Sequence, residues 1–251
     1  MVERRNWQAE EVREALALYL VTDFGRFHSR NPDIIALASR LDRTPSSIAL
    51  KLANFAALDD SLPRKGMANA SALDRQVWAE YLSQPDAVIA AFARQTAQRA
   101  RPVAAPIGFA ENPTAFDHLG GARQVQSLQR VGQDLFRRMI LTSYQGRCAL
   151  TGIDDPKLLT ASHILPWSEA PDMRMRPTNG LCLNALHDRA FDRHLISFDP
   201  EGRLLVSPRV STTTREALLR GCKEGLDRPK RFAPDLDFLA LHRARFEALA
   251  A

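Results

Sequence analysis

The sequence predicts a mainly α-helical protein in which a small α+β module follows an N-terminal helical domain. Apolar residues recur at helical spacing through residues 7–60. Asn31-Pro32 and Thr44-Pro45 each have the form of an N-cap followed by proline at the first helical position. Short β-type segments separated by polar turns occur between residues 144 and 206. These three observations place helices in the first half and a mixed module in the second.

The composition favours a globular protein of the cytoplasm. The 251 residues are 45% hydrophobic and 25% charged, enough for one large core or two modest ones. No apolar run reaches the roughly 20 residues of a membrane-spanning helix, and residues 1–7 lack the apolar core of a secretory signal. The cysteines, Cys148, Cys182 and Cys222, are too few for a disulfide framework and odd in number. We therefore expect a cytoplasmic protein with no membrane partner.

The net charge of +5 is unevenly distributed. Residues 1–120 carry 14 Lys and Arg against 14 Asp and Glu, whereas residues 121–251 carry 20 against 15. A basic, Arg-rich half suits a polyanionic partner such as nucleic acid. An Arg-rich composition alone would give the same excess.

Three helices are expected in the first domain, residues 1–62. They cover Gln8–Leu20, Asp33–Leu41 and Ser46–Leu58, and a short break joins the last two. This order is typical of a helix-turn-helix unit. If the third helix reads DNA, four of its residues could face it: Ser46, Ser47, Lys51 and Asn54. A three-helix bundle used for packing or protein contact fits the same pattern.

A helical connector and linker, residues 63–122, follows. Helices are expected at Ala72–Leu82 and Asp86–Arg99, and prolines between residues 101 and 113 indicate an extended linker. At the other end of the chain, residues 211–251 are expected to form a C-terminal helical extension.

The module at residues 123–210 combines helices with short strands. Its expected elements are, in order, Gln124–Tyr144 (helix), Cys148–Gly152 (strand and turn), Leu158–Ile164 (strand), Asn184–Phe191 (helix) and 196–206 (a hairpin that extends the small sheet). His163 ends the second strand, Asn179 precedes the helix, and His187 lies inside it.

These residues resemble the HNH endonuclease family over roughly Gln133 to Val206. The resemblance rests on four blocks in order: Gly132-Gln133-x-x-Phe136-Arg137, Tyr144-x-x-Arg147-Cys148-Ala149-Leu150-Thr151-Gly152, Ala161-Ser162-His163-Ile164-x-Pro166-Trp167, and Asn179-Gly180-Leu181-x-Leu183-x-x-Leu186-His187-x-x-x-Phe191-Asp192. It implies a C-terminal ββα-metal domain that hydrolyses phosphodiester bonds of double-stranded DNA with a divalent metal, Mg²⁺ or Mn²⁺.

The resemblance also implies roles for three residues. His163 matches the general base, because a neutral imidazole can take a proton from water. His187 matches the metal ligand on the helix. Asn179 matches an asparagine that ties the loop to the strand and orients the base.

One departure from the family concerns the metal. Many members carry Asp or His just before the base histidine as a second ligand, and this chain has Ser162 there. The cation could rely on His187, waters and the DNA phosphate. Asp192 could instead complete the site, Asn184 is a third candidate, and His194 is a further one.

A second departure is the missing zinc knuckle, which many relatives build from two Cys-x-x-Cys pairs. Thr151 stands where the partner of Cys148 would be, and Cys182 has no cysteine within reach. We expect no structural zinc, and Cys148 and Cys182 should be small buried apolar residues.

Arginines flank the predicted site. Arg189 and Arg193 lie in or just after the helix, and Arg174 and Arg176 lie in the loop before it. Each could contact a DNA phosphate or could be a solvated surface side chain.

By analogy with the family, the chain is a restriction or phage-defence endonuclease with an N-terminal target-recognition unit. Cutting both strands would suit a homodimer. The alternative is a catalytically weak or inactive DNA-binding or regulatory protein on the same scaffold, which Ser162 favours. A ribonuclease, or an enzyme that a partner activates, fits the same residues.

Overall fold

A computed structural model describes residues 5–62, 69–99, 120–166 and 169–250. Helices dominate the described residues, and two small antiparallel sheets lie in the second half of the chain. This agrees with the prediction of a mainly helical protein with a small α+β module in its second half. Within these stretches, no helix combines the length and apolar character that crossing a membrane requires.

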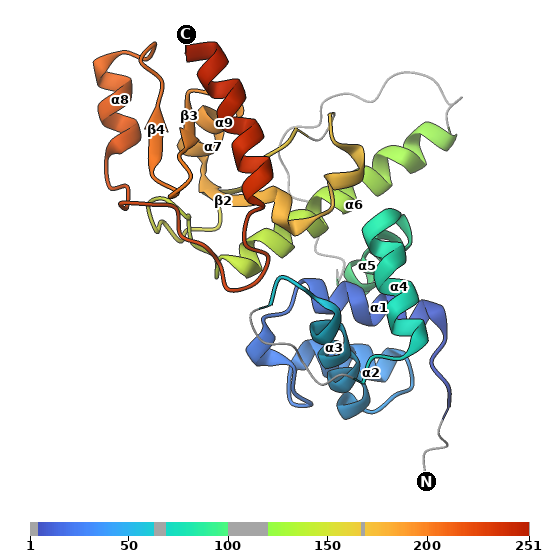
Figure 1. Ribbon diagram of the computed structural model, residues 1–251. Helices are drawn as coiled ribbons and strands as arrows, with labels where there is room; N and C mark the ends of the chain where they lie inside the picture. The colour runs from blue at the N-terminus through green and yellow to red at the C-terminus, as the bar shows by residue number, and fades with distance from the viewer. Residues whose placement is uncertain (1–4, 63–68, 100–119, 167–168, 251) are drawn as a thin grey trace, which may run out of the picture.

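The N-terminal unit is a cluster of helices around α1 (Figure 1). It contains α1 (Ala9–Leu20), the short 3-10 helix η1 (Phe24–Arg26), α2 (Pro32–Arg40), α3 (Pro45–Leu58), α4 (Ala72–Ser83) and α5 (Asp86–Arg99). The predicted caps are confirmed, because Asn31 accepts from the Asp33 amide and Thr44 from the Ser47 amide. α1 packs against α3, α4 and α5. The helices that we expected in a connector therefore pack as part of this unit.

The polar residues of α3 do not lie where a DNA-reading helix would place them. The Lys51 ammonium lies 2.7 Å from the buried Asp74 carboxylate of α4, and the Asn54 amide donates to the same carboxylate at 3.0 Å. Both side chains are at least nine-tenths buried. The prediction that Lys51 and Asn54 face DNA is wrong, because α4 covers that side of α3. Ser46 is exposed and Ser47 half-buried, and the outward face that they share with Leu50 carries no charge.

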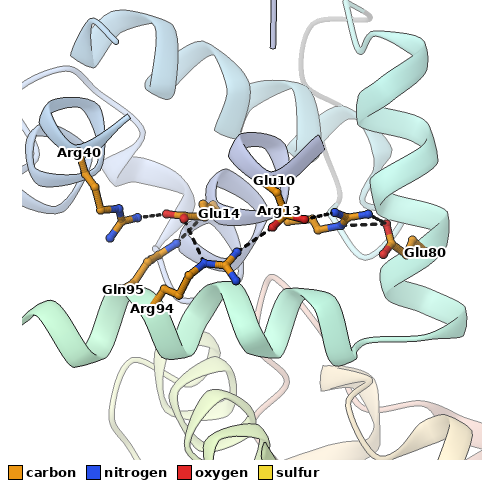
Figure 2. Close-up of polar contacts among 7 residues, drawn as sticks. All are labelled: Glu10, Arg13, Glu14, Arg40, Glu80, Arg94 and Gln95. Carbon is orange, nitrogen blue, oxygen red and sulfur yellow. Dashed lines mark hydrogen bonds and ion pairs between the residues drawn. The ribbon is translucent and has the colours of Figure 1, made fainter. Parts of the chain in front are cut away.

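Ion pairs fix α1 to its neighbours (Figure 2). The buried Glu14 carboxylate pairs with Arg40 of α2 and with Arg94 of α5. On α1 itself, Arg13 reaches Glu80 of α4 at 3.0 Å. These charges are thus paired within the unit, which agrees with the zero net charge of residues 1–120.

The second half is built on α6 (Gly120–Ser143), which runs beside a two-stranded antiparallel sheet (Figure 1). The strands are β1 (Leu159–His163) and β2 (Gly180–Asn184), and α7 (Ala185–Asp192) follows β2 directly. His163 pairs with Gly180 in the register. A Cβ on Gly180 would lie 2.4 Å from Ile140 and 2.7 Å from Phe136, so only glycine lets α6 approach the sheet this closely.

A second sheet and two helices complete the chain. β3 (Ile196–Phe198) pairs with β4 (Leu204–Val206), and α8 (Thr212–Leu219) and α9 (Leu236–Ala250) follow. The hairpin was expected to extend the first sheet. Instead, within the described residues, its strands pair only with each other, and α9 packs on β3.

The two halves contact each other through buried polar groups. Arg231, before α9, donates to the backbone oxygens of Tyr19 and Thr22 at 3.1 and 2.8 Å. Its Nε lies 3.3 Å from the buried Asp59 carboxylate. The Tyr81 hydroxyl of α4 donates to the Met175 carbonyl in the β1–β2 loop at 2.7 Å. The N-terminal unit thereby supports the β1–β2 loop, whose Arg174 carbonyl lies next to His163.

Candidate active site

His163 stands at the end of β1 with its ring held on both sides. The ring stacks on Phe136 of α6, with centroids 3.8 Å apart and planes 10° apart. Its Nε2 lies 3.0 Å from the Arg174 carbonyl oxygen. Because a carbonyl only accepts, Nε2 carries the proton, and in the neutral ring the lone pair belongs to Nδ1.

The surroundings of His163 favour the neutral ring. Burial holds the pKa of His163 below its usual value, the hydrogen bond to the Arg174 carbonyl opposes this, and the nearby Arg174 guanidinium lowers the pKa further. At neutral pH the ring is therefore mainly in the form that can accept a proton.

Asn179 is fully buried and ties the loop to the strand. It ends the 3-10 turn η3 (Pro177–Asn179), which follows the similar turn η2 (Pro171–Met173). Its amide oxygen accepts from the Leu165 amide at 2.8 Å, and its amide nitrogen donates to the Leu165 and Met173 carbonyls. This geometry fits the architectural role that the resemblance implies.

A pocket of about 470 Å³ opens beside His163. β1 and α7 provide most of its walls, and His242 of α9 also lines it. Five residues from the sequence prediction line it: His163, Arg189, Asp192, Arg193 and His194.

His187 does not line this pocket. Its ring is buried on the side of α7 that packs near α8, with Nδ1 3.0 Å from the Asn184 amide oxygen and Nε2 2.9 Å from the Leu218 carbonyl. Both ring nitrogens thus face protein oxygens. We correct the expectation that His187 holds the metal, because neither nitrogen is turned toward the pocket that contains His163.

Asn184 is corrected for a similar reason. Its amide oxygen caps α7 by accepting from the Leu186 and His187 amides at 3.1 Å. Its amide nitrogen donates to Thr151 Oγ1 at 3.2 Å and contacts Cys148 Sγ at 3.7 Å. Cys148 and Cys182 are fully buried, as predicted.

Asp188 lies in the pocket and was missed by the sequence reasoning. Its carboxylate accepts from the buried Ser162 hydroxyl at 2.6 Å, and Asp192 follows it four residues later on the same helical face. The Asp-x-x-x-Asp spacing was the available signal. Ser162, which we regarded as a missing ligand, orients a carboxylate instead.

The Asp188 carboxylate acts on the pKa of Asp192. Burial raises the pKa of Asp192, the nearby Asp188 charge raises it further, and Arg189 and Arg193 act in the opposite direction. Paired carboxylates at a pocket wall are favourable oxygen ligands for a hard divalent cation.

Asp188 and Asp192 fit such a cation only as a two-residue site. Among the described residues, no three His, Cys, Asp or Glu side chains come together closely enough to hold a metal ion. Mg²⁺ commonly keeps several waters and binds one or two carboxylates together with substrate phosphate, so two protein ligands are chemically sufficient.

The two arginines of the β1–β2 loop do not line the pocket. Arg174 and Arg176 are half-buried, and Arg174 acts on His163 through its carbonyl and its charge.

Comparison with known families supports this location. Residues 148–199 match the family model described as HNH endonuclease. The matched segment contains β1, β2, α7 and β3, and with them His163, Asn179, Asp188 and Asp192. No curated protein matches the chain.

Proposed function

We propose that this protein, whose residues 148–199 form a domain of the HNH endonuclease family, is a divalent-metal-dependent endonuclease that cuts double-stranded DNA. One observation carries the proposal. A histidine held in its neutral form and a pair of carboxylates line the same pocket, which brings a base and cation ligands to one place.

Each group of residues in the pocket has a separate role in hydrolysis. His163 Nδ1 accepts the proton of the attacking water, while the Arg174 carbonyl fixes the opposite side of the ring. Asp188 and Asp192 would hold Mg²⁺ or Mn²⁺, which supplies charge neutralisation at the phosphate and the leaving oxygen. Arg189 and Arg193 on the rim would contact the phosphate.

Ser162 bears on the alternative of an inactive DNA-binding protein. That alternative drew its support from the absence of a ligand before His163. Since the Ser162 hydroxyl holds Asp188 in the pocket, the position has a use in an active site. The enzyme is therefore favoured.

Plasmid cleavage tests the proposal. Purified protein should nick or cut plasmid DNA with Mg²⁺ or Mn²⁺, and EDTA should stop it. His163→Ala, Asp188→Asn and Asp192→Asn should each abolish cutting and leave DNA binding nearly intact. His187→Gln, on the buried face of α7, should alter stability more than chemistry. Binding without cutting under every metal tried would exclude the enzyme.

We further propose a restriction or phage-defence role in the cytoplasm, with the N-terminal unit contributing to target choice. Its contribution would come from a cleft of about 1140 Å³, which residues 23–25 and 62 line together with residues 142–145, 147 and 227–231. Arg147, Arg228 and Lys230 at this cleft are exposed, and none of them forms a salt bridge with a described residue. Cutting both strands would need a homodimer or two successive nicks.

A further inference from the structure

The backbone at His194 is unusual for a residue with a side chain. His194 lies two residues after the end of α7 and has φ of 51°, in the left-handed region that favours glycine. This is the usual conformation where a helix is closed by a hydrogen bond from the Leu195 amide to the Ala190 carbonyl, and a non-glycine residue there costs on the order of 1 kcal/mol. The His194 side chain lines the same pocket as His163 and Asp188.

A chain of hydrogen bonds determines which nitrogen of His194 carries its proton. His242 Nε2 lies 3.1 Å from the Phe191 carbonyl oxygen and 3.1 Å from His194 Nδ1. The carbonyl only accepts, so His242 Nε2 must carry a proton, and this one proton is shared between the Phe191 carbonyl oxygen and His194 Nδ1. His194 Nδ1 therefore accepts from His242, and the remaining proton of the neutral His194 ring is on Nε2.

His242 is itself rigidly held. It is 3% exposed, and its ring stacks on Phe191 with centroids 3.7 Å apart and planes 5° apart. The Ser197 hydroxyl, 3.0 Å from His242 Nδ1, donates to the lone pair there. Both nitrogens of His242 are thus engaged, and the ring cannot turn without breaking these hydrogen bonds.

We propose that His194 is a second catalytic residue, whose Nε2–H donates a hydrogen bond to a non-bridging oxygen of the scissile phosphate. This rests on the proposed nuclease function. His242 and Ser197 are positioning residues that act through His194. A preorganised donor is worth most where charge develops on the phosphate in the transition state. The same proton placement excludes His194 as a metal ligand, because Nε2 has no lone pair to offer.

His194→Gly tests the donor and removes the backbone strain. We expect a folded protein whose melting temperature is equal to or above that of the wild type. Its DNA affinity, measured in Ca²⁺, should stay within about threefold, and its single-turnover cutting should be about 10- to 100-fold slower. His194→Asn, which tolerates the same φ and retains an N–H donor, should recover part of the rate. Wild-type rates in both variants would overturn the proposal.

A phosphorothioate substrate gives a readout that a structural role would not move. Sulfur accepts hydrogen bonds more weakly than oxygen, so one diastereomer should slow the wild type more than it slows His194→Gly. Equal sensitivity in the two proteins would contradict direct contact between His194 and the phosphate.

A double-mutant cycle tests the positioning role. His242→Gln should slow cutting in the wild-type background and add little in the His194→Gly background. Fully additive effects would show that His242 does not act through His194. If the wild type itself cuts no DNA, the proposed function fails; if it cuts and His194→Gly cuts equally, only the present inference fails.

Discussion

Ser162 sets the direction of one carboxylate in the pocket. Its side chain is 2% exposed, and its hydroxyl donates to Asp188 across the gap between β1 and α7. A ligand that is hydrogen-bonded in this way loses less rotamer freedom when it binds a cation. Groups that orient metal ligands commonly change metal affinity 10- to 100-fold when they are removed.

Ser162→Ala should therefore weaken the binding of the cation without removing any of its ligands. We expect the Mn²⁺ concentration for half-maximal cutting to rise about tenfold, while the rate at saturating Mn²⁺ falls less. Thr160→Val, in the same strand and pocket, is the matched control and should leave the Mn²⁺ dependence unchanged. An unchanged dependence in Ser162→Ala would show that Asp188 does not hold the metal.

Among the structural elements, α7 has two faces with different tasks. One face buries His187 against the Leu218 carbonyl of α8, and the other presents Asp188 and Asp192 to the pocket. Neighbouring residues of an α-helix lie about 100° apart. If α7 began one residue earlier or later, its side chains would therefore turn by about 100°. His187 would then leave the buried face, and Asp188 would leave the pocket.

The close approach of α6 to β2 depends on Gly180. Gly180→Ala would place a methyl group against Ile140 and Phe136, and Phe136 is the residue on which His163 stacks. We expect the unfolding free energy, measured by urea titration, to fall by about 1–3 kcal/mol, together with slower cutting. Gly25→Ala, where nothing lies within 4 Å of the added group, should change the stability little. Equal stability of the two variants would mean that α6 can withdraw without strain.

The packing of α9 on β3 should depend on pH through His242. Burial lowers the pKa of His242 from 6.5 to about 4. Between about pH 4 and pH 6.5, the His242 ring of the unfolded chain therefore binds a proton, whereas the ring in the folded protein stays neutral. The stabilising contribution is complete above pH 6.5 and is lost as the pH falls toward 4. The shift corresponds to about 3 kcal/mol.

Urea titrations from pH 7 to pH 4 measure this effect as a difference between two proteins. The stability of the wild type should fall more steeply than that of His242→Gln, which has no titrating ring. Parallel curves for the two proteins would show that the folded protein accepts the proton on His242.

For the whole molecule, DNA binding should combine the active-site pocket with the cleft between the two halves. Changing Arg147, Arg228 and Lys230 to Gln should weaken DNA binding. The logarithm of the DNA-association constant decreases linearly with the logarithm of the salt concentration. The steepness of this decrease should be smaller by about one for each phosphate that the variant no longer neutralises. Hydrolysis of a small phosphodiester at the pocket should not change.

Three other exposed cations provide a control with the same change of charge. Arg30, Arg75 and Arg220 do not line the cleft. Their substitution by Gln should reduce the slope less. If the two triple variants behave alike, the cleft does not bind DNA specifically.

Local patterns predicted much of this architecture. The caps at Asn31 and Thr44, the positions of His163 and Asn179, and the mainly helical class follow from short-range signals. Two of the failures involve interactions between distant residues. The burial of Lys51 depends on Asp74, which is 23 positions away, and the burial of His187 depends on Leu218, 31 positions away. No local pattern carries that information.

The buried cluster behind α7 has a practical consequence. Cys148 and Thr151 form one pair and Asn184 and His187 another, each with two residues between its members, and hydrogen bonds among them hold that side of the module. These side-chain contacts clamp that side of the module. A chelator should therefore withdraw the catalytic cation from a molecule that stays folded, and adding the cation back should restore cutting without refolding. The proposed nuclease could thus be stored, loaded with DNA and then started at a chosen moment.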